Sequence, residues 1–139
     1  KLQVFQRGSV YLATKKIGKR NPKTPANIEQ LFTPSETRPN YIFQTFLYAS
    51  IMCRQQTLKV APALLYIHRA ASDSYSPVIE MGEPRQPKIP VNNFTFFEDE
   101  FRKRLHTLLE EIFSENEPFT QTEDIKKCSY CDFKAICKR

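Results

Sequence analysis

Three of the last twelve residues are cysteines, and closely spaced thiols restrict how a chain end can fold. Cys128, Cys131 and Cys137 follow the spacing C-x2-C-x5-C. Thiolates at this spacing reach one soft centre, an iron–sulfur cluster or zinc, and they select such metals over calcium or magnesium. Four protein ligands are normally needed, and the run supplies three. The alternatives are reduced, partly buried thiols or a disulfide in a secreted domain.

The other residues that bind soft metals are scattered along the chain. Cys53 lies in an apolar stretch typical of a buried helix, so we expect a small buried side chain there. His68 and His106 are single histidines in or beside periodic segments. Either one would complete a zinc site by adding a fourth ligand to the three clustered cysteines. We expect a cytoplasmic protein. In this reducing compartment, clustered cysteines bind metal more often than they form disulfides.

The composition is that of one globular domain. The chain has 139 residues, of which 40% are hydrophobic, and this is enough to build a core. No run approaches the roughly 18 apolar residues that cross a bilayer, so we expect no membrane insertion. The net charge is +6, and the distribution of the charges says more than their sum.

Positive charge gathers at both ends of the chain. Residues 1–28 contain seven Lys or Arg and no Asp or Glu. The candidate nucleic-acid contacts among them are Lys15, Lys19, Arg20 and Lys23. A second basic cluster surrounds the cysteines and consists of Lys126, Lys127, Lys134, Lys138 and Arg139. Such patches attract polyanions, most often nucleic acid, although each patch alone is also compatible with an ordinary solvated surface.

The first half of the chain predicts a short strand, a long loop and an apolar helix. Partial alternation favours the strand over 8–15, and the loop over 16–39 is rich in Pro, Asn, Thr and Lys, with one helical turn at 25–32. Asn40 is a candidate N-cap for a helix over 41–56. The side chains expected to pack inward from this helix are Phe43, Leu47, Ile51 and Met52.

The second half predicts a hairpin and a long amphipathic helix. Residues 59–68 have the composition of a buried strand, and residues 75–81 have that of its partner. Thr95-x-x-Glu98 is a capping box that opens the clearest helix, which should end near Ser114. Beyond this helix the chain is polar until the cysteine run.

Two polar side chains interrupt the apolar helix of the first half. Gln44 and Tyr48 are four residues apart, so both emerge on one face, one turn apart. By itself a Q-x-x-x-Y pair is weak evidence for a functional site, because such residues also occur at the border of a hydrophobic core without any other role. Its context is more specific, since a strand ending in Thr14-Lys15-Lys16-Ile17-Gly18 precedes it and C-x2-C-x5-C ends the chain.

In this order, the three motifs resemble the C-terminal half of a RecB-like PD-(D/E)XK nuclease domain. The chain looks closest to the iron–sulfur branch, which includes AddB-type subunits of bacterial helicase–nucleases and the CRISPR-associated exonucleases. The resemblance implies an α/β (mixed α+β) fold with a PD-(D/E)XK restriction-endonuclease-like core, truncated at its N-terminal side. A single, partial nuclease-like domain would span residues 1–139, with a cysteine-rich C-terminal loop over 116–139.

The resemblance also implies roles for individual residues. In the family, acids on two strands bind Mg²⁺ or Mn²⁺, which lowers the pKa of bound water and neutralises charge on the scissile phosphate. Lys16 matches the Lys of the D-x-K-T-G segment, which helps to orient the attacking water. Gln44 and Tyr48 match a motif that contacts DNA and shapes the site. Cys128, Cys131 and Cys137 would hold a 4Fe–4S cluster with a fourth, upstream cysteine that is absent here.

The chain departs from the family pattern at its acids. Thr14 stands where the family has a metal-binding Asp or Glu, and a neutral hydroxyl does not replace the charge of a carboxylate. The earlier acid would fall near or before Lys1. We therefore expect a DNA repair or recombination domain that hydrolyses phosphodiesters in an intact parent protein, together with a helicase subunit or helicase domain. As this chain alone, we expect the domain to be inactive or only to bind DNA. The alternative is a small zinc-binding protein-interaction module without nuclease activity.

Overall fold

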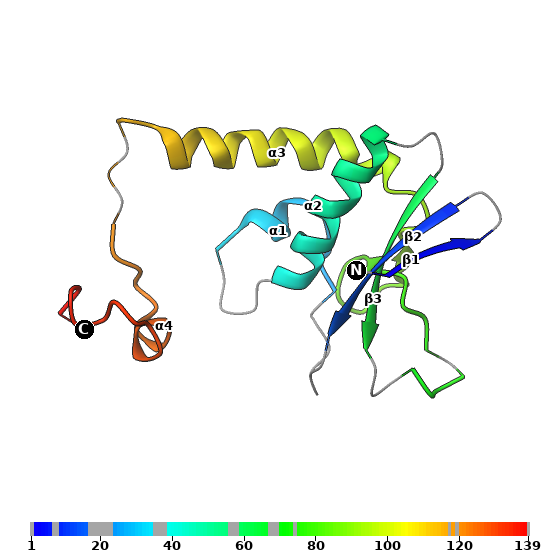
Figure 1. Ribbon diagram of the computed structural model, residues 1–139, viewed down its shortest axis with the longest axis horizontal. Helices are drawn as coiled ribbons and strands as arrows, with labels where there is room; N and C mark the ends of the chain where they lie inside the picture. The colour runs from blue at the N-terminus through cyan, green and yellow to red at the C-terminus, as the bar shows by residue number, and fades with distance from the viewer. Residues whose placement is uncertain are drawn as a thin grey trace. The chain divides into compact units, whose positions relative to one another are not determined.

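The computed structural model describes residues 2–6, 9–16, 24–34, 39–55, 59–66, 70–73, 75–116, 118 and 120–138. Within these ranges the chain forms a mixed α/β structure (Figure 1), as the sequence predicts. The chain divides into two compact units, Lys1–Leu108 and Leu109–Arg139. No helix in the described ranges is long and apolar enough to span a bilayer.

The first unit is built around a three-stranded sheet with the order β1-β2-β3. β1 (Leu2–Gln6) and β2 (Ser9–Lys16) are antiparallel neighbours, whereas β3 (Lys59–Tyr66) runs parallel to β2. A parallel pair needs a crossover connection, and helix α2 (Asn40–Gln55) lies within it. Figure 1 shows α2 beside the sheet, and the helix contacts both β2 and β3. The strands predicted at β2 and β3 are confirmed, whereas β1 was not predicted.

Helix α2 packs against the sheet through a face that differs from the expected one. Its buried side chains are Ile42, Thr45, Phe46, Ala49 and Ser50. Half-buried at the edges of this face are Phe43, Leu47 and Met52. Ile51 is 49% exposed, so its predicted inward position is wrong. The helix is apolar on nearly every side, so periodicity does not show which face is buried. Thr45 is tolerated in the buried face because its hydroxyl donates a hydrogen bond to the Tyr41 carbonyl oxygen at 2.7 Å.

A cluster of five phenylalanine rings forms the centre of the core. Phe101, on helix α3 (Thr95–Phe113), is completely buried and lies beside the four other rings. Its ring-centroid distances are 5.3 Å to Phe32, 5.7 Å to Phe43, 6.0 Å to Phe46 and 5.8 Å to Phe94. Tilted and edge-on arrangements at these distances are favourable. The cluster therefore joins α1 (Glu29–Phe32), α2 and α3.

A chain segment covers the outer edge of β3. Val78 forms an isolated antiparallel bridge with Ala63. The Tyr75 hydroxyl accepts a hydrogen bond from Tyr66 N–H at 2.8 Å and donates one to the Leu64 carbonyl oxygen at 2.5 Å. These contacts satisfy backbone groups that an edge strand otherwise leaves open. The predicted hairpin partner is thus present as one bridge and a side-chain contact, rather than as a full strand.

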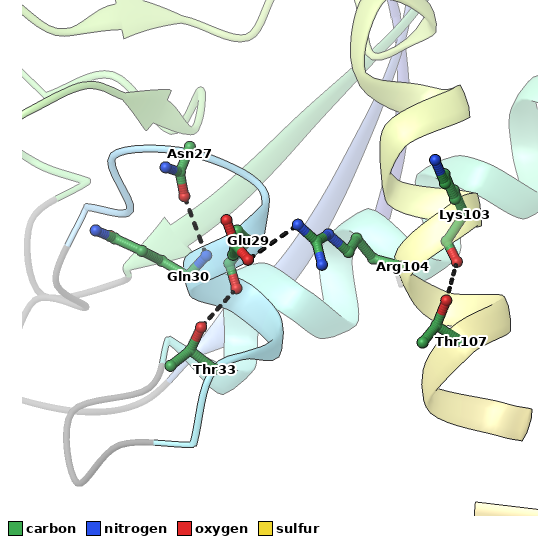
Figure 2. Close-up of polar contacts among 7 residues, drawn as sticks. All are labelled: Asn27, Glu29, Gln30, Thr33, Lys103, Arg104 and Thr107. Atoms are coloured by element: carbon green, nitrogen blue, oxygen red, sulfur yellow. Dashed lines mark hydrogen bonds and ion pairs between the residues drawn. The ribbon is translucent and has the colours of Figure 1, made fainter. Parts of the chain in front are cut away.

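Polar contacts fix the short helix α1 (Figure 2). Asn27 Oδ1 accepts a hydrogen bond from Gln30 N–H at 3.1 Å, and Gln30 Oε1 accepts one from Ala26 N–H at 2.9 Å. These bonds satisfy donors at the start of the helix, and the helical turn predicted in this loop is confirmed. Arg104 Nη2 lies 2.9 Å from Glu29 Oε1 and ties α3 to α1. Both side chains are about half exposed, so this ion pair contributes roughly 0–1 kcal/mol.

Helix α3 agrees with the prediction at both ends, but its cap differs. Asn93 Oδ1 accepts hydrogen bonds from the N–H of Thr95 at 3.2 Å and from its hydroxyl at 2.9 Å. Asn93 therefore supplies the side-chain acceptor at the start of the helix, where the sequence predicts Thr95. The helix ends at Phe113, next to the predicted Ser114. A small two-stranded sheet precedes it, formed by β4 (Glu80–Met81) and β5 (Ile89–Pro90).

The second unit has no buried side chain among its described residues. Helix α4 (Ile125–Ser129) is capped by Asp124, whose Oδ1 accepts a hydrogen bond from Lys126 N–H at 3.2 Å. The exposed apolar side chains of this unit are Leu109, Ile112, Phe113, Ile125, Tyr130, Phe133 and Ile136. With so little burial, hydrophobic packing contributes little to the stability of this unit.

Candidate functional site

The carboxyl ends of β2 and β3 lie at the same end of the sheet as the start of α2. Because α2 connects two parallel strands, it runs back along them and begins where β2 finishes. Figure 1 shows the arrowheads of both strands at the end where α2 starts. The last residues of the two strands, Lys16 and Tyr66, are paired in register. Open α/β sheets bind their ligands at this end, so the topology directs attention there.

Gln44 and Tyr48 are joined by a direct hydrogen bond on α2. Gln44 Nε2 donates to Tyr48 Oη at 3.1 Å. Gln44 is exposed, and Tyr48 is half-buried against the core. The bond restricts the rotamers of both side chains, so the pair forms a preorganised polar group on the helix surface. The structure therefore brings these two predicted site residues together.

Gln44 also lines a surface hollow at the start of α2. The hollow has a volume of about 470 Å³, within the usual range of small-molecule sites. Its lining residues in the described ranges are Asn40, Tyr41, Phe43, Gln44 and Leu47. None of these side chains carries a formal charge. Tyr41 was not predicted as a site residue, although its position three residues before Gln44 places both on neighbouring parts of the helix surface.

Tyr75 and Tyr41 both lie close enough to Tyr66, at the end of β3, to affect its ionisation. Tyr66 is 5% exposed, and burial raises its pKa to about 12, with smaller contributions from Tyr75 and Tyr41. A phenol with this pKa stays protonated at neutral pH and keeps its O–H donor. Tyr66 was also missed from the sequence. The signal that points to it is its place at the carboxyl end of a buried strand, which is informative only once that strand is known to be parallel to β2.

Strand β2 carries the first predicted motif. In register, Thr14, Lys15 and Lys16 pair with Leu64, Leu65 and Tyr66. The strand contains no Asp or Glu, and neither does β1. The remaining predicted nucleic-acid contacts, Lys19, Arg20 and Lys23, lie outside the described residues. The geometry of the basic segment beyond β2 therefore stays a prediction.

The three C-terminal cysteines lie on α4 and in the turns that follow. Cys131 N–H donates to the Cys128 carbonyl oxygen at 3.1 Å, and Cys137 N–H donates to that of Phe133 at 3.2 Å. All three are free thiols of intermediate exposure. In the part of the chain that the structure describes, no group of three or more His, Cys, Asp or Glu side chains is arranged to hold a metal ion. The thiols are suitable donors for a soft metal, but they do not form a preassembled site.

Cys53 lies in a different environment from the C-terminal thiols. Burial raises the pKa of its thiol above the ordinary value, the Glu98 carboxylate raises it further, and a hydrogen bond with Thr95 acts in the opposite direction. Cys53 packs against the core but is of intermediate exposure, so it is only partly buried, whereas the sequence predicts a buried side chain. A thiol with a raised pKa is a poor metal ligand and a slow nucleophile, which suits a structural role. His106 is exposed on α3, and His68 lies outside the described residues.

Comparison with known protein families covers nearly the whole chain. The family model of the PD-(D/E)XK nuclease superfamily matches residues 7–138. This stretch includes β2, the Gln44–Tyr48 pair on α2, β3 and the cysteine run, in the order described above. No curated protein and no solved structure matches the chain. The chain therefore belongs to the PD-(D/E)XK nuclease superfamily.

Proposed function

We propose that this domain processes DNA in repair or recombination, as a nuclease-like domain of the RecB/AddB kind. The observation that carries the proposal is that Lys16, at the end of β2, and Gln44, in the second turn of α2, belong to the same end of one β2-α2-β3 unit, with Gln44 hydrogen-bonded to Tyr48 in the middle of the helix. Membership of a nuclease superfamily makes the phosphodiester backbone the expected substrate for this end of the sheet. A cytoplasmic helicase subunit or helicase domain would be a natural partner.

Each residue of the group has a proposed role. Gln44 and Tyr48 offer an amide and a hydroxyl, which bind phosphate or sugar oxygens and fix the position of a strand without reading its sequence. Lys16 would add positive charge next to the scissile phosphate and orient the attacking water. Tyr66 contributes a neutral phenol near the end of the strand that pairs with β2.

Cleavage needs carboxylates that the first two strands do not contain. A divalent ion such as Mg²⁺ or Mn²⁺, bound by Asp or Glu, lowers the pKa of water and stabilises the transferring phosphate. Residues 1–28 contain no Asp or Glu, and Thr14 occupies the position in β2 where the motif requires one. We therefore propose that the chain on its own binds DNA without cutting it, and that hydrolysis requires acids supplied by an intact parent protein.

The basic residues give a direct test of DNA binding. Each Lys or Arg that neutralises a phosphate adds about 0.9 to the slope of log affinity against log salt for duplex DNA. Replacing Lys19 and Arg20 with Ala should lower this slope by roughly 2. A control with the same loss of charge replaces Lys59 and Lys103, both exposed, and should leave the slope unchanged. An equal change in both double variants would mean that net charge alone attracts DNA, and would contradict the proposed site.

The catalytic part of the proposal is tested with linear DNA and Mg²⁺. We expect no degradation by the purified chain, because Thr14 cannot supply the missing charge. The Lys16→Ala variant serves as the control for contaminating nucleases, since it should behave like the wild type. Robust degradation that disappears in Lys16→Ala would show that the metal ligands are present, and would refute the claim of inactivity.

We also propose that the C-terminal thiols bind a soft metal, a 4Fe–4S cluster or, as the alternative, zinc, together with a fourth ligand from elsewhere. The lack of buried side chains among the described residues of the second unit supports this, because metal–thiolate bonds order small segments that packing cannot. Metal analysis of the purified chain should find iron or zinc. Cys128→Ser should lower the metal content and Cys53→Ser should not. Equal metal content in both variants would contradict the assignment.

A further inference from the structure

We infer that the hollow at the start of α2 binds one unpaired nucleobase of a DNA strand. This inference rests on the proposed function and adds the state of the substrate, because the strand would have to be single or frayed at this point. Among the residues that the structure describes, the hollow is lined by Asn40, Tyr41, Phe43, Gln44 and Leu47, all from one helix. Of these, only Gln44 belongs to the polar pair described above.

The chemistry of the hollow suits a flat group with apolar faces and polar edges. Tyr41 is 45% exposed and offers an aromatic ring on which a base can stack. Phe43 and Leu47 supply hydrocarbon walls. The amides of Asn40 and Gln44 each provide a donor and an acceptor, which is the combination that the edge of a base requires. The hydrogen bond between Gln44 Nε2 and Tyr48 Oη holds one of these amides in place before the ligand arrives.

The charge around the hollow is compatible with a polyanion. None of the 16 residues of α2 is acidic, and the one charged side chain of the helix is Arg54 in its last turn. The one acidic residue of α1 is Glu29, which forms an ion pair with Arg104. Phosphates on either side of a bound base would therefore meet no repulsion from α2.

The volume and position of the hollow favour a single base over a duplex. At about 470 Å³ the hollow holds a small organic group, whereas a duplex keeps its bases stacked and inaccessible. Because α2 starts at the carboxyl ends of β2 and β3, a base in the hollow would lie at the same end of the sheet as the backbone of Lys16. The phosphates next to this base in the DNA strand would then pass the end of β2.

The inference is tested with two single-stranded oligonucleotides of equal length, one normal and one carrying a run of abasic nucleotides. Both have the same phosphates, so their affinities differ only through the bases. Stacking on one aromatic ring predicts that the wild-type chain binds the normal strand on the order of tenfold more tightly. Tyr41→Ala should abolish most of this preference, and Tyr41→Phe should retain it. The matched control is Ile51→Ala, a change on the same helix at a side chain of similar exposure, 49% against 45%, which should also retain it.

The possible outcomes separate this inference from the proposed function. Equal affinity of the wild type for both strands, or an equal loss of preference in Tyr41→Ala and Ile51→Ala, would overturn the inference while leaving salt-sensitive DNA binding intact. Absence of all DNA binding would overturn the proposed function as well. The comparison of strands in the wild type needs no variant, so it still decides the inference if circular dichroism shows that Tyr41→Ala disturbs the helix.

Discussion

Phe101 is the side chain whose removal should destabilise the fold most. It has no solvent exposure, and its ring lies 5.3–6.0 Å from those of four other phenylalanines. Truncating a buried Phe to Ala typically costs about 3–5 kcal/mol through lost burial and a residual cavity. Each ring pair adds about 0.5–1.5 kcal/mol, so we expect Phe101→Ala to fall at the upper end of that range. A domain of this size is stable by roughly 5–15 kcal/mol, so the variant should be marginal.

Urea unfolding followed by circular dichroism measures this loss, since the chain contains no Trp to report by fluorescence. Phe96→Ala is the matched control, because it makes the same substitution on the same helix at a side chain that is 84% exposed. Its free energy of unfolding should change by no more than about 0.5 kcal/mol. Phe101→Leu should cost roughly 1–2 kcal/mol and keeps the test measurable if the Ala variant does not fold. Equal costs for Phe96→Ala and Phe101→Ala would refute the aromatic cluster as the centre of the core.

Three further changes test the surroundings of the site. Burial raises the pKa of Tyr66 to about 12 from an unfolded value near 10, so its contribution to stability is complete below about pH 10 and is lost as the pH rises towards 12. Tyr66→Phe should flatten this alkaline loss in urea unfolding at stepped pH, and an unchanged profile would contradict the assignment. Tyr75→Phe removes two hydrogen bonds to β3 and should cost about 1–3 kcal/mol, whereas Tyr130→Phe, at 93% exposure, should cost nothing measurable. Glu98→Gln should lower the pKa of Cys53 and speed its alkylation, followed by mass spectrometry; a slower reaction would contradict the proposed cause.

Local sequence signals were sufficient for the long helices and for two strands. The periodicity of α3 predicts the extent of the helix but not the burial of its whole apolar stripe, because Leu109 and Ile112 are 43% and 42% exposed. The composition of α2 predicts burial but not its direction, so Ile51 was placed inward when it is half exposed. β1 has only five residues, two of them glutamines (Gln3 and Gln6), which is too little alternation to be recognised without the partner strand that pairs with it.

The site was predictable only where its geometry is local. Gln44 and Tyr48 meet because a spacing of four residues fixes their proximity on any helix. Tyr66 belongs to the same end of the sheet only through the parallel register of β3 with β2, a long-range pairing that composition does not encode. The hollow beside Tyr41 depends in the same way on which face of α2 is buried.

The salt dependence of DNA binding by the wild-type chain tests the central claim most directly. If Lys15, Lys19, Arg20 and Lys23 each neutralise a phosphate, log affinity for duplex DNA should fall linearly with log salt, with a slope of about −3 to −4. Fluorescence anisotropy of a labelled duplex over a series of salt concentrations measures this slope. A chain that does not bind DNA at low salt, or whose affinity does not fall as salt rises, would contradict the account.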